Sequence, residues 1–312
     1  MKRLLTYLVW LALFLGCSPE DRREPLSGGA IRFVADVSVE ASKASGLLSG
    51  TVLPSGSRAG LFAGSAQSGG GSSEVVMNNV VGTIGAEGSV SYDPLKYYEA
   101  GREYTFYACW PYTASASYTD ASAAPSLTVS LADRAGSQDD YLWSCLKVTP
   151  AAGGSTAAGR LTFRHALCRI RVRIWNGSGT GVLLNGITLT APGSGTLSLA
   201  DGSWKEIGTS NSFPSFTLCD YSEAVKIPQD AFYEIPVSLL QLPVGSEAMK
   251  KQVFSITIGG ETFEVSPSTP AEGWSAGCSY LYTVWYATDG VAFQGTVEPW
   301  LPVDGGEVDT EE

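Results

Sequence analysis

Apolar and polar residues alternate along much of this chain, and this period of two restricts its fold more than any other feature. The first alternating stretch begins after Ala30, with apolar residues at Ile31, Phe33, Ala35, Val37 and Val39. Such alternation is typical of a strand with one buried face. Further along, Gly259-Gly260 separates two alternating stretches, as a two-residue hairpin turn does. No stretch of ten or more residues keeps a helical period, so the pattern predicts an all-β fold.

The length of 312 residues favours two domains over one. A run rich in Ala, Gly and Ser at residues 151–159 separates two halves that each have strand character. We therefore expect an N-terminal β-sandwich over residues 30–158 and a C-terminal β-sandwich over residues 159–312, which ends in an acidic tail. The formal net charge of −11 argues against nucleic acid as a partner, because phosphate binding needs clustered Lys and Arg.

The N-terminus has the layout of a secretory signal. Lys2 and Arg3 precede an apolar run over residues 4–15, which is shorter than the roughly 20 residues of a membrane-spanning helix. Phe14-Leu15-Gly16-Cys17 resembles a lipobox, with Phe where Leu is usual. We expect residues 1–16 to be a lipoprotein signal peptide, Cys17 to carry the lipid, and residues 17–29 to form a flexible tether. The alternative is an ordinary signal peptide in which Cys17 is incidental.

The alternating pattern changes phase in the middle of the chain. Leu161 and Phe163 are apolar at odd positions, whereas Ile170, Val172 and Ile174 are apolar at even positions. Since a slip of one residue moves every side chain to the other face, the sequence predicts a bulge or turn near His165. We expect His165 to be a structural residue that is hydrogen-bonded locally.

Two groups of side chains are candidates for recognition. Arg169, Arg171 and Arg173 share one face of a predicted strand in an otherwise acidic protein. They fit a patch for an acidic partner or glycan, although a solvated face or charges that block a sheet edge explain them more simply. The C-terminal third also contains three tryptophans whose rings are able to stack on sugars, namely Trp274, Trp285 and Trp300. Trp285, in an alternating stretch, is more simply part of the core or of a sheet surface.

Catalytic chemistry has little support in this sequence. His165 is the single histidine, and no nucleophile elbow, phosphate-binding loop, zinc motif or calcium-loop spacing occurs. A glycosidase needs only two carboxylates, which sequence alone does not exclude. We expect no enzyme, no cofactor and no metal.

The cysteines beyond Cys17 are scattered, and we expect buried free thiols at Cys109, Cys145, Cys168, Cys219 and Cys278.

Taken in order, several segments resemble the fimbrillin-like (minor-fimbrium-like) family of Bacteroidales pilins and fimbrial lipoproteins. The matching segments are Ile31-Arg32-Phe33, Ser42-Lys43-Ala44-Ser45-Gly46, Arg58-Ala59-Gly60-Leu61-Phe62-Ala63, the stretch 104–112 (YTFYACWPY), Asp140-Tyr141-Leu142-Trp143, the stretch 161–167 (LTFRHAL), Trp274, Tyr280-Leu281-Tyr282-Thr283-Val284 and Val297-Glu298-Pro299-Trp300. Each segment alone is weakly specific, but the ordered set covers the whole chain that follows the signal.

The resemblance implies a fold and a mode of assembly. It implies two tandem transthyretin-like Greek-key β-sandwich domains after a lipoprotein signal, exported to the outer membrane and cell surface. In polymerising members of this family, an Arg- or Lys-specific protease removes the first strand together with the lipid, and a neighbouring subunit donates a strand to the open groove. Carried onto this chain, the scissile bond is Lys43–Ala44. The removable strand then presents Ile31, Phe33, Ala35, Val37 and Val39.

The sequence thus leads to two hypotheses of function. The first is a fimbrial subunit or accessory protein that serves adhesion, with other fimbrial subunits and a host protein or glycan receptor as partners. The alternative is a surface lipoprotein that binds glycans without polymerising. Residues 301–312 contain Gly305-Gly306 and five acidic residues, which makes them a poor apolar donor strand and argues mildly against a stalk subunit.

Overall fold

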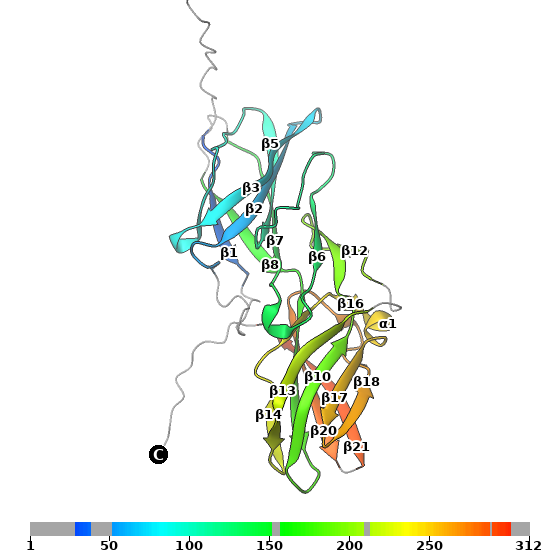
Figure 1. Cartoon of the computed structure of the whole chain (residues 1–312). Helices are drawn as coiled ribbons and strands as arrows, with labels where there is room; N and C mark the ends of the chain where they lie inside the picture. The colour runs from blue at the N-terminus through cyan, green and yellow to red at the C-terminus, as the bar shows by residue number, and fades with distance from the viewer. Residues whose placement is uncertain (1–28, 39–51, 152–156, 209–212, 288, 301–312) are drawn as a thin grey trace, which may run out of the picture.

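The computed structural model describes residues 29–38, 52–151, 157–208, 213–287 and 289–300, and these ranges consist mostly of β-strands (Figure 1). A short helix, α1 (Ser246–Met249), and two 3₁₀ turns, η1 (Ala86–Gly88) and η2 (Ala135–Ser137), lie between strands. No helix within these ranges is long and apolar enough to cross a membrane. The all-β class predicted from the alternating pattern is confirmed.

The N-terminal strands form a closed ring in the order β1–β4–β3–β2–β5–β7–β8, in which β8 pairs with β1. Its members are β1 (Phe33–Val37), β2 (Arg58–Gln67), β3 (Ser73–Ile84), β4 (Ser89–Ser91), β5 (Arg102–Trp110), β7 (Leu142–Val148) and β8 (Gly159–His165). The ring encloses a core to which β1 contributes Phe33, Ala35 and Val37 and β5 contributes Phe106. β1 is therefore a structural member of the ring.

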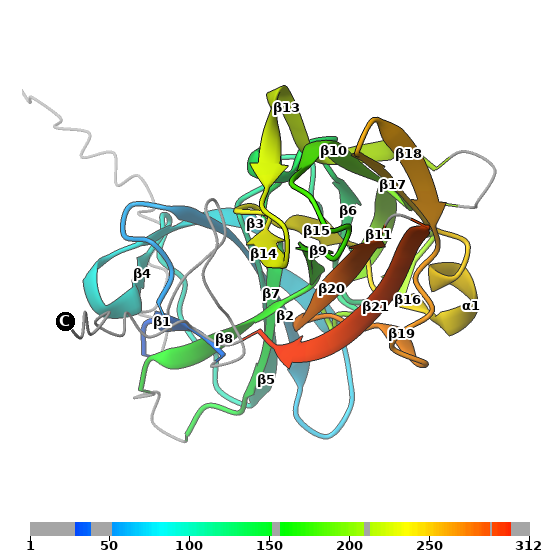
Figure 2. The ribbon, with the colours of Figure 1, turned by 90° about the horizontal axis from the view of Figure 1, so that it is seen from below.

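The C-terminal strands form a sandwich of two sheets. One sheet has the order β13–β10–β17–β18, and the other has the order β14–β9–β20–β21 with β15 also paired to β9. The strands are β9 (Cys168–Asn176), β10 (Val182–Thr190), β13 (Ser215–Ile227), β14 (Ala231–Glu234), β15 (Leu239–Gln241), β17 (Val253–Ile258), β18 (Glu261–Val265), β20 (Cys278–Ala287) and β21 (Gly290–Pro299). Figure 2 shows β10, β17 and β18 on one side of this sandwich and β9, β20 and β21 on the other. Alternating side chains of both sheets, such as Val172, Ile187 and Tyr282, form the second core.

A small sheet joins the two halves of the chain. β6 (Ser126–Ser130) comes from the first half, and it pairs with β11 (Ser194–Ser198), which pairs with β12 (Trp204–Lys205). This sheet lies beside the junction between the ring and the sandwich (Figure 1). A further two-stranded sheet, β16 (Val244–Gly245) with β19 (Gly273–Trp274), packs near α1.

The change of phase near His165 marks the passage between the two cores. β8 ends at His165 and β9 begins at Cys168, so the predicted turn is confirmed. Phe163 lies in the core of the ring, whereas Ile170 lies in the core of the sandwich. The division of the chain at residues 158 and 159 stays a prediction, and β8, which follows that point, pairs with β1 and β7 in the ring.

His165 is held by distant residues, which corrects the expectation of local hydrogen bonding. Its Nδ1 lies 2.9 Å from Oδ1 of Asp140, which is 25 residues earlier in the chain. The imidazole also stacks on Trp300, with ring centroids 4.0 Å apart. Trp300 is fully buried and packs against Leu167 and Leu240 at the junction. The residue after β21 therefore links the end of the sandwich to the end of β8.

We expect Trp300→Ala to destabilise the protein by about 3–5 kcal/mol, because a fully buried indole leaves a large cavity. The matched control is Trp285→Ala, which removes an indole that is 40% exposed and should cost about 1 kcal/mol or less. Thermal unfolding followed by circular dichroism compares the two variants. Equal melting temperatures for the two variants would contradict this role of Trp300.

Candidate functional site: the first strand and its seat

The buried face of the first strand is the strongest functional candidate. Ile31, Phe33, Ala35 and Val37 are each 0–3% exposed, while Arg32 is exposed and Asp36 is half-buried. The alternation seen in the sequence thus places the apolar side chains inside the ring, as the pleat of a strand requires. Burial of a large apolar side chain contributes about 1.5–3 kcal/mol, so this face binds β1 firmly to the ring.

Aromatic residues form the floor under β1. The Phe33 ring lies 5.0 Å from the Phe106 ring in an edge-on arrangement and 6.0 Å from the Tyr92 ring. The Tyr92 hydroxyl donates a hydrogen bond of 2.8 Å to the carbonyl of Ile31. Burial raises the pKa of Tyr92, so the hydroxyl keeps the proton that it donates.

Backbone hydrogen bonds hold β1 on both sides. β1 pairs in parallel with β8 over Phe33–Val37 and antiparallel with β4 at Phe33 and Val34. The Gly159 amide donates to the carbonyl of Arg32 at 2.8 Å, and the Ser38 amide donates to the carbonyl of Phe163 at 2.9 Å. An ion pair between Arg160 and Asp36 adds little, because the Arg160 side chain is largely exposed. Removing β1 would leave ladder groups of both β4 and β8 without partners.

A glycine allows β1 to lie close to η1. Gly88 has a φ of +74°, and a Cβ at this position would lie 2.1 Å from the carbonyl oxygen of Ala35. We call the groove that β1 occupies between β4 and β8 its seat. Any larger residue at position 88 would therefore push β1 away from this seat and would also strain its own backbone. The sequence does not reveal this contact, because Gly88 and Ala35 are far apart in the chain and come together only when the ring forms.

The structure brings together four of the residues proposed for the removable strand, namely Ile31, Phe33, Ala35 and Val37. The fifth, Val39, lies outside the described residues, as do the proposed processing residues Lys43 and Ala44 and the proposed lipidation residue Cys17.

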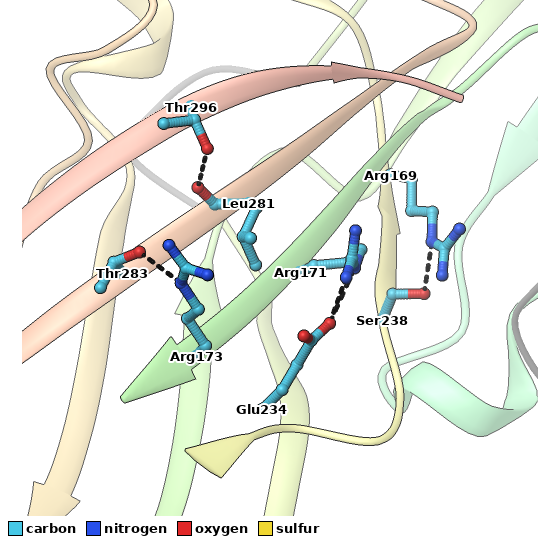
Figure 3. A network of polar contacts seen from close by, with 8 residues as sticks. All are labelled: Arg169, Arg171, Arg173, Glu234, Ser238, Leu281, Thr283 and Thr296. Carbon is cyan, nitrogen blue, oxygen red and sulfur yellow. Dashed lines mark hydrogen bonds and ion pairs between the residues drawn. The ribbon is translucent and has the colours of Figure 1, made fainter. Parts of the chain in front are cut away.

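The three arginines of β9 lie on the outer face of the five-stranded sheet (Figure 3). Nε of Arg169 donates to Oγ of Ser238 at 3.1 Å, Nε of Arg171 donates to Glu234 at 3.0 Å, and Nε of Arg173 donates to Oγ1 of Thr283 at 2.9 Å. β9 has neighbours on both sides, so the explanation of charges that block a sheet edge is wrong. The same side chains instead form a polar network on this face.

Other candidate side chains are less suited to binding. Trp274 is buried with its Nε1 donating to the Tyr282 hydroxyl at 2.7 Å, so of the three candidate tryptophans only Trp285 is exposed.

The cysteines Cys109, Cys145, Cys168, Cys219 and Cys278 are free thiols. Burial raises the pKa of Cys109 to about 11, which keeps this thiol protonated and unreactive. No group of three or more potential metal ligands occurs within the described residues.

The chain is therefore an all-β protein with two parts: a closed ring of strands that includes the first strand, and a two-sheet sandwich. A model of the family described as Fimbrillin-like matches residues 49–300. Because this match spans most of the chain, the protein belongs to the fimbrillin-like family. The family consists of structural proteins, so the expectation that the chain is not an enzyme is confirmed. A search of the curated proteins found no match.

Solved structures share this fold at low sequence identity. A fimbrial protein from Bacteroides vulgatus ATCC 8482 is 13% identical, with a TM-score of 0.57 over 86% of this chain and 99% of that chain. The tip fimbrial protein Mfa3 from Porphyromonas gingivalis, with a C-terminal truncation, is 12% identical, with a TM-score of 0.50 over 87% of this chain and 99% of that chain. At these identities, the likeness concerns the fold.

We expect Gly88→Ala to loosen β1 and to raise amide hydrogen exchange across Phe33–Val37, because the new methyl group meets the carbonyl oxygen of Ala35. Gly101→Ala is the matched control. Gly101 also has a φ of +74° but has nothing within 4 Å of an added Cβ, so both variants share a backbone cost of about 1–2 kcal/mol. Equal exchange in β1 for the two variants would show that the contact does not hold the strand.

Proposed function

We propose that this protein is a subunit or accessory protein of a cell-surface fimbrium that is assembled by donor-strand addition after its first strand is removed. It is exported as a lipoprotein and is held at the outer membrane through Cys17 until processing. Membership of the fimbrillin-like family supports the fimbrial role. The likeness in fold to a fimbrial protein of Bacteroides vulgatus and to the tip fimbrial protein Mfa3 supports it further.

The seat of β1 is the observation that carries this proposal. β1 closes the ring between β4 and β8, so its loss leaves two strands with unpaired ladder groups and an apolar floor that includes Phe106 and Phe163. A donated strand restores both kinds of contact, since main-chain hydrogen bonds supply affinity and alternate side chains fill the pockets.

The position of the proposed cleavage site fits this mechanism. β1 ends at Val37, and Lys43–Ala44 follows in the stretch 39–51 that precedes the rest of the ring. A cut at this bond releases β1 together with everything before it, including Cys17. The lipid is therefore a temporary tether in this mechanism.

The last strand, β21, is an integral part of the sandwich. β21 pairs with β20 along its whole length, and Phe293 stacks on Tyr282 with centroids 4.9 Å apart. β21 is thus part of the sandwich core, and any donated segment has to come from beyond Trp300. Because residues 301–312 are acidic and contain Gly305-Gly306, we propose that they donate less well than an apolar strand, which favours a tip or accessory role over a stalk role without preventing assembly between copies.

The alternative is a surface lipoprotein that binds glycans without polymerising. Exposed aromatic residues on the sandwich favour it as a second candidate, and the two functions are compatible in one molecule. Assembly assays and carbohydrate assays separate them.

We expect an Arg/Lys-specific protease to cut the purified chain that begins at residue 18 after Lys43, and the trimmed protein to form oligomers. Lys43→Gln is the control variant and should remain intact at this bond and monomeric. Mass spectrometry identifies the new N-terminus at Ala44, and size-exclusion chromatography follows the oligomers. A chain that is cut at Lys43 but keeps β1 bound and stays monomeric would contradict the proposal.

A peptide competition tests whether the vacated seat drives assembly. A synthetic peptide of residues 30–41 should prevent oligomer formation by the trimmed protein, because it restores the apolar contacts of Phe33 and Val37. The same peptide with Ser at both positions should have little effect. If both peptides act equally, side-chain burial in this seat is not the driving force.

A further inference from the structure

Three aromatic side chains form a row across the outer face of the C-terminal sandwich. Trp175 of β9 pairs in register with Phe232 of β14 on one side and with Trp285 of β20 on the other. β9 runs parallel to β20 and antiparallel to β14, so residues far apart in the sequence meet in one line. The row lies near the turn between β20 and β21, at the end of the sandwich away from the ring (Figure 1).

The row is exposed in spite of its apolar surface. Phe232 is 49% exposed and Trp285 is 40% exposed, and Trp175 lies between them. The ring centroids of Trp175 and Phe232 are 4.6 Å apart, those of Trp175 and Trp285 are 6.0 Å apart, and those of Phe232 and Trp285 are 5.9 Å apart, so the tilted rings form a compact triangular cluster. These contacts hold the rings as one preformed platform. A contiguous group of exposed aromatic rings is a candidate for an interaction surface.

The next row of the same face supplies positive charge. Arg173 stacks over Phe232, with Cζ 4.9 Å from the ring centroid, and its Nε is held by Thr283 (Figure 3). Within the described residues, Arg173 has no ion pair with a carboxylate, whereas Glu234 pairs with Arg171. Arg173 therefore places a positive charge beside the rings, in a protein whose formal net charge is −11.

We propose that this surface, formed by Trp175, Phe232, Trp285 and Arg173, binds an acidic carbohydrate, namely a sugar ring that carries a carboxylate. The faces of aromatic rings carry partial negative charge and attract the C–H groups on the apolar face of a pyranose. The guanidinium of Arg173 has its remaining N–H groups for a carboxylate, and a charge-assisted pair of this kind is the strong form of hydrogen bond. Platform and cation together match both parts of such a sugar.

The size of the surface favours a sugar over a protein partner. A stable protein interface buries about 800 Å² on each side, whereas this platform consists of three rings and one arginine.

This inference rests on the second candidate function, glycan binding, and deepens it because it names the class of glycan. β1 belongs to the ring and the platform belongs to the sandwich, so strand replacement and sugar binding involve different surfaces (Figure 1). The binding test uses the unprocessed chain. A failure to bind sugar would therefore not count against the proposal of strand replacement, and a failure to assemble would not count against the proposal of sugar binding.

Isothermal titration calorimetry on the chain that begins at residue 18 tests the proposal with matched probes. Trigalacturonic acid and its methyl ester share the same three sugar rings and differ in the charge and the methyl group of each carboxyl. Lactose with and without an added sialic acid (3′-sialyllactose and lactose) provides a second pair. We expect each acid to bind at least about tenfold more tightly than its neutral partner, and the difference to shrink as salt rises. Trp285→Ala should weaken binding of both acids about tenfold or more, and Arg173→Gln should abolish the preference for acid over ester.

Two control variants should bind as the parent does. Tyr97→Ala removes an aromatic ring that is 42% exposed on the other half of the chain, and Arg134→Gln removes an arginine whose side chain is 61% exposed. Thermal unfolding confirms that all variants are folded. The proposal is overturned by equal binding of acid and ester, by no binding at millimolar concentration, or by unchanged binding in Trp285→Ala. It is also overturned if the parent self-associates and Trp285→Ala does not, since the platform is then an interface between copies.

Discussion

The burial of one face of β1 between β4 and β8 is the interaction on which the N-terminal ring depends. Without β1, the hydrogen-bonded path from β4 to β8 is open, and Phe106 loses its edge-on contact with Phe33. An open path exposes two strand edges, which proteins normally cover or pair. β1 thus supplies both the backbone pairing and the apolar face that complete the ring.

The two halves of the chain have separate cores. The core of the sandwich is built from β9, β10, β13, β17 and β20, and no described residue of β1 belongs to it. The junction is held instead by Trp300, which stacks on His165 while His165 bonds to Asp140. Since this contact joins the end of β8 to the end of β21, one of the two strands that flank β1 is tied to the sandwich.

The sequence predicted the features that depend on local periodicity. The buried face of β1 and the turn after His165 follow from a period of two, which each strand carries within itself. The partner of His165, the neighbours of Arg171 and the row that contains Trp175 depend on strand order and register between distant segments. The parallel pairing of β9 with β20 joins Trp175 to Trp285, and no local signal indicates that pairing.

The outer face of the sandwich shows how one strand acquires two kinds of surface. Arg169, Arg171, Arg173 and Trp175 alternate with the core residues of β9, so the same periodicity that builds the core also lines up the arginines. Cross-strand partners then decide what each outward residue does. Glu234 neutralises Arg171, whereas Thr283 orients Arg173 without neutralising it. Because a hydroxyl leaves the charge of a guanidinium intact, Arg173 beside the aromatic row retains attraction for an anion.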